Sequence, residues 1–295
     1  MNGNEWLAER FEASRGHLRA VAYRIVGSLG EADDAVQESW LRVSGADASC
    51  VENLEGWFTT VLARVCLNIL RSRKSRREES LEAEGSSPRA VVASKSIDPE
   101  NEAVLAESVG LALLVVLERL APAERVAFVL HDMFDLAFED IADIVGRSPA
   151  AARQLASRAR RRVRGTSGGS VGELSEQREV IEAFLVALRV GDIVGLLAVL
   201  DPDVVRRADR FAVRLDEERE LHGAPRVAEE VLKYRDIARF ARTIQVNDSG
   251  GIVVAPNGYL RTVISCTIEG RRITKMEVIA DPERLRKLNL AAFPD

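Results

Sequence analysis

The chain has 295 residues, of which 46% are hydrophobic and 29% are charged, and its formal net charge is −5. This composition excludes a disordered chain and leaves room for two or three folded domains. The negative net charge excludes binding to nucleic acid by bulk electrostatics, so contact with DNA requires local basic faces. The sequence has no apolar run of membrane-spanning length and no signal-peptide pattern, so we expect a cytoplasmic protein.

Cysteine and histidine are too scattered to predict a metal or catalytic site. Cys50, Cys66 and Cys266 are odd in number and lack CxxC or mixed Cys/His spacing. Such cysteines are typical of reduced thiols in the cores of cytoplasmic proteins. The three histidines are equally isolated, and a packing or surface role is favoured for each. We therefore expect no metal and no cofactor.

Residues 5–77 have helical periodicity throughout. Apolar side chains recur at i, i+3 and i+4 spacing in three segments, residues 6–25, 31–43 and 55–77. In the second segment we expect Trp40 and Leu41 to face inward. The outer face of that segment is acidic, and on the residues alone it is solvated surface.

The third segment ends in a dense run of cations, RSRKSRR, with five Arg or Lys residues between positions 71 and 77. Cations at a helix C-terminus interact favourably with the helix dipole. This density exceeds what a helix end requires, so contact with phosphates is favoured. Residues 78–101 then contain prolines, serines and little periodicity, which predicts a flexible linker.

Residues 137–164 predict a helix, a tight turn and a second helix. Ile141, Ile144 and Val145 give the first helix an apolar stripe. Gly146 is placed to end that helix, because glycine enters the left-handed conformation at little cost. Ser148 then precedes a proline, a pattern typical of an N-cap and the first turn of a new helix.

The second of these helices has two distinct faces. At about 100° per residue, one half of the helix holds Ala152, Leu155, Ala156, Ala159 and Val163. The opposite half holds Arg153, Gln154, Ser157, Arg158, Arg160, Arg161 and Arg164. The polar face includes Arg153, Gln154, Ser157, Arg158 and Arg161. These side-chain types hydrogen-bond base edges and phosphates in the DNA major groove. A solvated basic helix is the alternative, but the helix–turn–helix context favours DNA binding.

The C-terminal part, residues 176–295, has a different pattern of apolar and polar residues. Helical segments come first, and period-two strands follow over residues 243–246, 251–256, 259–268 and 272–279. This order predicts a compact α+β domain. Asp209 and Asp216 are candidates to face a pocket if this domain holds one, and His222 lies before a glycine, but no paired carboxylates or His–Asp spacing stands out. We therefore expect no catalytic residues.

Three stretches of the first half resemble a known family: EADDAVQESWLR, NLEGWFTTVLARVCLNILRSRKSRR and LERLAPAERVAFVLHDMFDLAFEDIADIVGRSPAAARQLASRARRRV. In order and spacing they are similar to the two conserved domains of bacterial extracytoplasmic-function (ECF) sigma factors of the sigma-70 family. VIEAFLVALRVGDIVGLLAVLDPDVV and ITKMEVIADPERL resemble parts of a SnoaL-like (NTF2-like) domain. The resemblance implies two all-α domains, sigma region 2 and a region 4 helix-turn-helix, followed by an α+β cone-shaped barrel.

The resemblance divides the chain into region 2 (1–77), a flexible linker (78–101), region 4 (102–164), a second linker (165–175) and a SnoaL-like regulatory domain (176–295). It implies a non-enzymatic subunit that binds core RNA polymerase, directs promoter recognition and helps to open the duplex. Its partners would be the clamp helices of the β′ subunit, the β flap and promoter DNA. A small molecule or a protein would act as an effector of the C-terminal domain.

The resemblance also implies roles for individual residues. The segment that docks on the clamp helices holds Asp33, Asp34, Gln37, Glu38, Trp40 and Arg42. The positions that capture and hold the −10 element hold Asn53, Trp57, Arg64, Asn68, Arg71 and Arg73. The positions that read the −35 element hold Arg153, Gln154, Ser157, Arg158 and Arg161.

Three motifs of related factors are altered here. The Trp-Leu-Pro-Glu-Pro segment of the linker is missing, the Asp-Gly-Gly-like element reads ADRF from residue 208, and Asn-Pro-Asp-Lys-Leu reads ADPERL from residue 280. We therefore expect a sister subgroup with an altered regulatory contact. Two other classes of function remain open: a ligand-sensing helix-turn-helix regulator that acts without polymerase, and a SnoaL-like enzyme with an accessory DNA-binding module.

Overall fold

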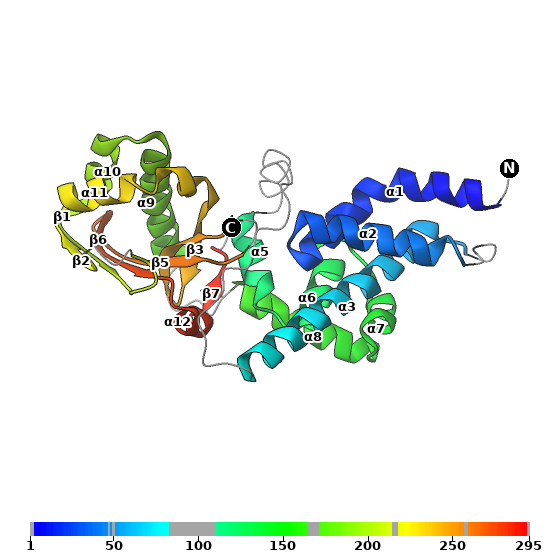
Figure 1. The fold of residues 1–295 in the computed structure, drawn as a ribbon. Helices are drawn as coiled ribbons and strands as arrows, with labels where there is room; N and C mark the ends of the chain where they lie inside the picture. Colours follow the sequence, from blue (N-terminus) through cyan, green and yellow to red (C-terminus); the bar gives the residue numbers. More distant parts are fainter. Residues whose placement is uncertain are drawn as a thin grey trace. The chain divides into compact units, whose positions relative to one another are not determined.

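The computed structural model describes residues 3–46, 48, 51–82, 110–164, 171–213, 218–256 and 259–293. They belong to two compact units. The N-terminal unit comprises Met1–Val109 and Leu117–Arg160, and the C-terminal unit comprises Gly110–Val116 and Arg161–Asp295. The N-terminal unit is helical and the C-terminal unit contains a sheet (Figure 1). Within the residues described, no helix combines the length and apolar character needed to cross a membrane.

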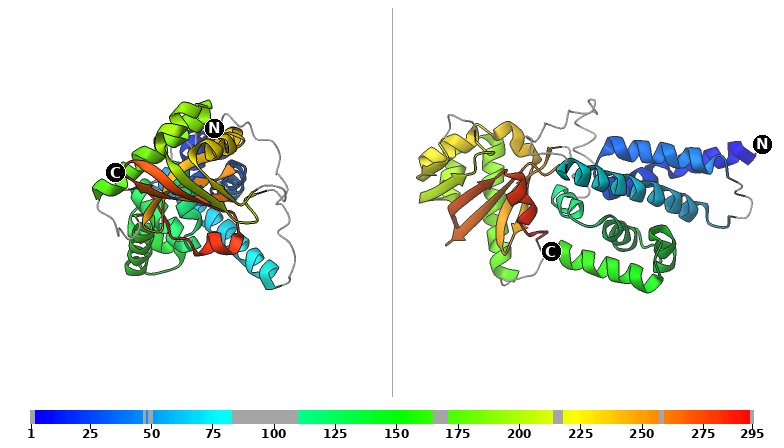
Figure 2. Two further views of the ribbon diagram at one scale, coloured as in Figure 1. Left: turned by 90° about the vertical axis from the view of Figure 1, so that its left-hand side faces the viewer. Right: turned by 60° about the horizontal axis from the view of Figure 1, so that its bottom comes forward.

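The N-terminal unit begins with three long helices, α1 (Gly3–Val26), α2 (Leu29–Val43) and α3 (Leu54–Glu82). Phe11 is fully buried among them, with its ring centroid 5.1 Å from that of Phe58 and 5.2 Å from that of Trp40. The right-hand view of Figure 2 shows α1 and α3 lying side by side. Gly27 separates α1 from α2 with a φ of +85°, a conformation that glycine adopts cheaply.

Helix α3 continues beyond the expected boundary. The linker was predicted to begin at residue 78, but residues 78–82 are helical. The reason is local, since this stretch, EESLE, contains helix formers and the first glycine comes only at Gly85. The rest of the predicted linker, and the start of the helix predicted from residue 103, lie outside the described residues.

The helix–turn–helix is confirmed. Its two helices are α7 (Phe138–Val145) and α8 (Pro149–Arg164). They follow α5 (Leu111–Glu118), α6 (Pro122–Phe128) and the π-helix η1 (Val129–Met133) along the chain. Gly146 ends α7 with a φ of 68°, as its position predicts. The hydroxyl of Ser148 accepts a hydrogen bond from the N–H of Ala151 at 3.3 Å, which is the expected N-cap contact. Helices α6 and α7 both pack on α3.

The C-terminal unit contains a seven-stranded sheet. The strands are β1 (Leu200–Ala208), β2 (Glu220–His222), β3 (Ala241–Val246), β4 (Ser249–Val254), β5 (Thr262–Glu269), β6 (Arg272–Ile279) and β7 (Leu290–Ala291). Their order is β2-β1-β6-β5-β4-β3-β7, and β1 runs parallel to β6 while the other pairs are antiparallel. The α+β class is therefore confirmed, but the sheet is open at β2 and β7 and does not close into the predicted barrel.

Helices cover one face of this sheet. They are α9 (Val171–Val190), α10 (Ile193–Val199) and α11 (Ala224–Leu232); η2 (Arg235–Phe240) and α12 (Pro282–Lys287) complete the unit. Helix α9 crosses β3 and β4, and α11 packs on β1 (Figure 1). Phe184, Leu196, Val227 and Met276 belong to the apolar core between helices and sheet.

Two boundaries differ from the prediction in this unit. Helix α9 begins at Val171, inside the predicted second linker. Strand β1 lies where the sequence predicted the continuation of a helix. Its apolar alternation is broken by Pro202 and by the adjacent arginines Arg206 and Arg207, so period two is hard to detect.

Candidate nucleic-acid interface

Helix α8 presents the two faces that its periodicity predicts. Ala152, Ala156 and Ala159 are fully buried, and Val163 is 9% exposed. The predicted reading residues are all exposed on the opposite face: Arg153, Gln154, Ser157, Arg158 and Arg161. The buried alanines let α8 pack closely on its own domain. The long polar side chains on the other face are accessible to a ligand.

Several arginines of α8 are held by groups from other helices of the N-terminal unit. The guanidinium carbon of Arg153 lies 5.0 Å from the centroid of the Phe138 ring. Nε of Arg158 lies 3.6 Å from Oε1 of Glu124. Arg160 forms an ion pair with Asp132, and this hydrogen bond raises the pKa of the guanidinium.

These anchoring groups were not predicted from the sequence. Glu124 precedes Arg158 by 34 positions and Asp132 precedes Arg160 by 28. Spacing along the chain therefore gave no signal, because only the packing of the helices brings the partners together.

On α3, three of the predicted −10 residues share one exposed face. Arg64, Asn68 and Arg71 stand at i, i+4 and i+7, and all three are exposed. Arg73 lies about 180° around the helix from Arg64 at about 100° per residue. The same periodicity could have set Arg73 apart from this group.

Arg73, predicted to hold the −10 element with these residues, is instead engaged inside the domain. Its side chain, 18% exposed, forms an ion pair with Glu31. Its Nη1 also donates to the carbonyl oxygen of Val26 at 2.9 Å. Arg73 therefore joins α3 to the end of α1 and the start of α2, and its charge is used within the protein.

Asn53 has a structural use at the start of α3. Its Oδ1 accepts a hydrogen bond from the N–H of Gly56 at 3.0 Å, which caps the helix. A Cβ atom at position 56 would lie 2.7 Å from Nδ2 of Asn53, so a larger residue there would displace this side chain. Trp57 follows, half-buried, with its ring centroid 5.7 Å from that of Phe58.

A hollow of about 550 Å³ lies between the start of α3 and the segment that leads into α7. It is lined by Asn53, Gly56, Trp57, Thr60, Asp135, Leu136, Ala137 and Asp140. Nearby, Nη2 of Arg64 donates to the main-chain carbonyl of Asp143 at 3.5 Å. The predicted −10 residues Asn53 and Trp57 thus line the same hollow as Asp135 and Asp140.

The predicted docking surface on α2 is largely exposed. Asp33 accepts hydrogen bonds from Arg19 at 2.6 and 3.1 Å, and Glu38 pairs with Arg42 at 3.0 Å. Trp40 packs on the core, as its periodicity predicts, and remains partly exposed. Leu41, predicted to face inward as well, is instead 62% exposed.

In the C-terminal unit, Asp209 serves as a structural clamp. Its Oδ1 accepts hydrogen bonds from the N–H groups of Phe211 and Ala212, at 3.0 and 3.1 Å. Its Oδ2 accepts from those of Ala280 and Asp281, both at 2.9 Å. One carboxylate therefore joins the two altered motifs, ADRF and ADPERL. Asp216, the other candidate for a pocket, lies outside the described residues.

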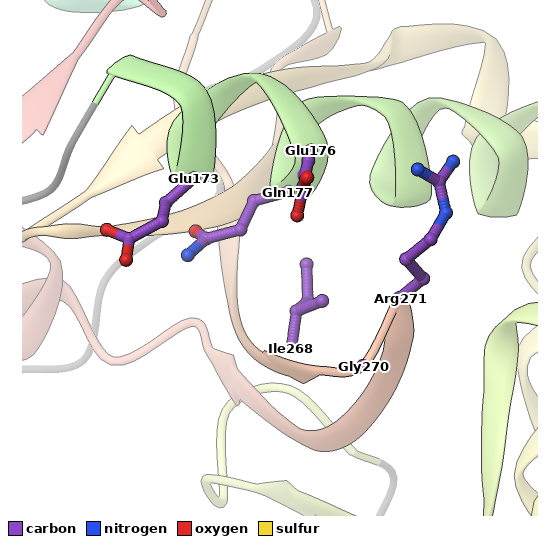
Figure 3. Close-up of a pocket in the computed structure, with 6 residues that line it drawn as sticks. All are labelled: Glu173, Glu176, Gln177, Ile268, Gly270 and Arg271. Carbon is purple, nitrogen blue, oxygen red and sulfur yellow. The ribbon is translucent and has the colours of Figure 1, made fainter.

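The described hollow of the C-terminal unit lies at one end of α9 (Figure 3). It measures about 250 Å³ and is lined by Glu173, Glu176, Gln177, Ile268, Gly270 and Arg271. Gln177 is used internally, because its Oε1 accepts a hydrogen bond from the N–H of Gly250 at 2.7 Å. His222, also considered as a catalytic group, is exposed and contacts Glu220 at 3.0 Å.

The described cysteines are unreactive. Burial raises the pKa of the Cys66 thiol and that of the Cys266 thiol to about 12, so both remain protonated near neutral pH. Cys50 lies outside the described residues. Among the residues that are described, no three His, Cys, Asp or Glu side chains gather as metal ligands would.

Comparison with known proteins identifies two conserved regions in the chain. The family model described as Sigma-70 region 2 matches residues 10–76, and the one described as Sigma-70, region 4 matches residues 110–163. The chain is 34% identical over 292 residues to the probable ECF RNA polymerase sigma factor SigI of Mycobacterium tuberculosis, covering 98% of each chain. It is 39% identical over 223 residues to the ECF RNA polymerase sigma factor SigJ of the same species, covering 75% of this chain and 71% of SigJ.

The crystal structure of SigJ matches over 94% of this chain and 98% of the SigJ chain, with 28% identity and a TM-score of 0.44. Together, the two sigma-70 regions and the full-length relative define the class. The chain belongs to the ECF RNA polymerase sigma factors. Members of this family bind core RNA polymerase and direct promoter recognition and transcription initiation, and sigma factors are in general not enzymes.

Proposed function

We propose that this sigma factor reads the −35 element with the exposed face of α8 and holds the −10 element with Arg64, Asn68 and Arg71 on α3. The observation that carries the proposal is that Ala152, Ala156 and Ala159 of α8 are buried while Arg153, Arg158 and Arg161 are exposed. Arginine, glutamine and serine on one helix face match the donors and acceptors of the major groove. The aligned cations of α3 suit the phosphates of a single strand.

In this proposal, α2 docks on the clamp helices of the β′ subunit and region 4 docks on the β flap. The exposed Asp33, Asp34, Gln37 and Arg42 support the first contact, and Leu41 adds an apolar anchor at its centre. The protein acts where the polymerase acts, in the cytoplasm.

The two reading helices must separate on a promoter. The names of the two elements place them about 25 base pairs apart, which is about 85 Å of duplex at 3.4 Å per base pair. In the structure α3 packs directly on α6 and α7, and Arg64 contacts Asp143. The N-terminal unit is therefore the closed, free form in this proposal, and binding to polymerase opens it.

The C-terminal domain modulates promoter reading in this proposal. Support comes from the C-terminal unit, which includes the first residues of α5 and the last residues of α8. The N–H of Ala292 donates to the carbonyl oxygen of Val163 in α8 at 2.9 Å. A small molecule or protein that moved this tail would act on the end of the reading helix. The use of Asp209 as a four-bond clamp supports a regulatory rather than a catalytic domain.

Reconstitution with core RNA polymerase tests the proposal. The full chain plus core enzyme is expected to give run-off transcripts from defined start sites, and core enzyme alone is not. Binding to DNA without any gain in specific transcription would identify a polymerase-independent regulator instead. A chain ended after Asn289 removes the bond to Val163 and is expected to bind core enzyme normally while its transcriptional activity changes.

A further inference from the structure

The basic face of α8 is bordered by two arginines that are each paired with a carboxylate. Arg158 and Arg160 lie about 160° apart around the helix at about 100° per residue. Arg158 meets Glu124 of α6 through Nε, and Arg160 meets Asp132 of η1 through Nε. Arg153 lies between Arg158 and Arg160 around the helix, and its guanidinium stacks on the ring of Phe138.

The two carboxylates differ in burial. The side chain of Glu124 is 7% exposed, whereas that of Asp132 is 21% exposed. Glu124 stands in the first turn of α6, where the helix dipole favours a negative charge. Arg158 places an opposite charge beside this buried carboxylate, and low exposure strengthens the attraction between the two charges. The side chain of Arg158 is still 51% exposed, so its outer end reaches solvent.

We propose that Glu124 is a positioning residue that fixes Arg158 through Nε and presents the outer nitrogens of its guanidinium to a base of the −35 element. The inference rests on the proposed function, in which α8 reads that element. Bidentate recognition of guanine requires two N–H groups in a set orientation. A side chain oriented before binding loses less entropy on contact, which raises specificity.

The same pair reduces non-specific attraction. Glu124 places a negative charge beside Arg158, and a paired arginine releases fewer counterions when it meets a phosphate. Glu124 therefore lowers the affinity of α8 for DNA of any sequence and raises its selectivity for one base. A carboxylate that only supported packing would not have this opposite effect on the two quantities.

The test uses the full chain with core RNA polymerase from a mycobacterium. Wild-type and Glu124→Gln holoenzymes select from promoter fragments whose −35 element is randomised, and binding to non-promoter duplex is measured over a range of salt concentrations. Glutamine keeps the shape of the side chain and removes the charge. We expect preference at one base position to fall by about fivefold or more. Affinity for non-promoter DNA should rise, with the salt dependence steeper by about one counterion.

Asp132→Asn is the matched control. It releases Arg160 at the other edge of the face, outside the proposed base-reading set, so non-promoter affinity is expected to rise with base preference unchanged. The double variant Glu124→Gln with Arg158→Ala should discriminate no worse than Arg158→Ala alone. This non-additivity is the signature of one residue acting through another.

Four results would overturn the inference. Base preference could be unchanged in Glu124→Gln, or specific and non-specific binding could fall together with the melting temperature. If Glu124→Gln does not fold, Glu124→Asp is measured, and full wild-type base preference with this shorter side chain contradicts the inference. If Arg158→Ala keeps the wild-type base preference, Arg158 does not contact a base of the −35 element and the inference is wrong. Promoter-specific run-off transcription by the wild type would still uphold the proposed function in that case.

Discussion

Helices α8 and α3 are both rich in cations, but they use them differently. On α8 the buried side is built of alanines, so the long cationic side chains project from the other side. On α3 the cations surround the end of the helix, and Arg73 turns into the domain while Arg71 stays exposed. The number of cations alone therefore does not show how many of them are exposed. On α8 the buried alanines on the opposite side leave the arginines exposed.

The largest effect is expected at Asp209, a charge used entirely within the protein. Asp209→Asn replaces one acceptor oxygen by a donor that faces the N–H groups of Ala280 and Asp281, or those of Phe211 and Ala212. The free energy of unfolding of the C-terminal unit should fall by about 3 kcal/mol. Urea unfolding followed by circular dichroism measures it. A change below about 0.5 kcal/mol, the range of ordinary surface substitutions, would show that the clamp is dispensable.

Arg73 and Arg71 give the sharpest contrast within one helix. Arg73→Ala leaves Glu31 without its cation and Val26 without its donor, so the free energy of unfolding should fall by about 2 kcal/mol. Arg71→Ala, its matched control, should change stability by less than about 0.5 kcal/mol. Equal stability losses in the two variants would contradict the separation of internal and external cations on α3.

At the −35 element, Arg158→Ala should weaken discrimination at one base by about 1.5 kcal/mol. The reason is the loss of a side chain already oriented toward the groove. Competition binding of holoenzyme to promoter fragments with single substitutions measures this difference. The exposed Arg162, outside the proposed reading set, is the control, and Arg162→Ala should keep the wild-type pattern. A uniform loss at every base in Arg158→Ala would assign that residue to phosphate.

The smallest effect is expected for Arg71→Ala on DNA. A side chain that contacts phosphate should weaken binding equally for all sequences and lower the salt dependence by about one counterion. Binding to a single-stranded −10 fragment over a salt series tests this. A change in sequence preference without a change in salt dependence would show that Arg71 reads a base.

Periodicity predicted the helix–turn–helix and the faces of α8 because those features depend on neighbours three or four residues apart. The same rule, applied to α3, would have separated Arg73 from Arg71. The clamp of Asp209 was beyond such reasoning, since its partners in ADPERL follow it by 71 and 72 positions. The pairing of Glu124 and Asp132 with arginines of α8 was not predicted for the same reason. The open sheet was not predicted either, because closure of a barrel depends on edge strands that are far apart in the chain.

Footprinting of the holoenzyme on one promoter tests the central claim most directly. Hydroxyl radicals should reveal protection at the −35 and −10 elements on the same DNA molecule, with Arg158→Ala weakening the first and Arg71→Ala the second. Protection at only one element, or loss of both in either variant, would contradict an account in which α8 and α3 of one chain separate to read two distant sites.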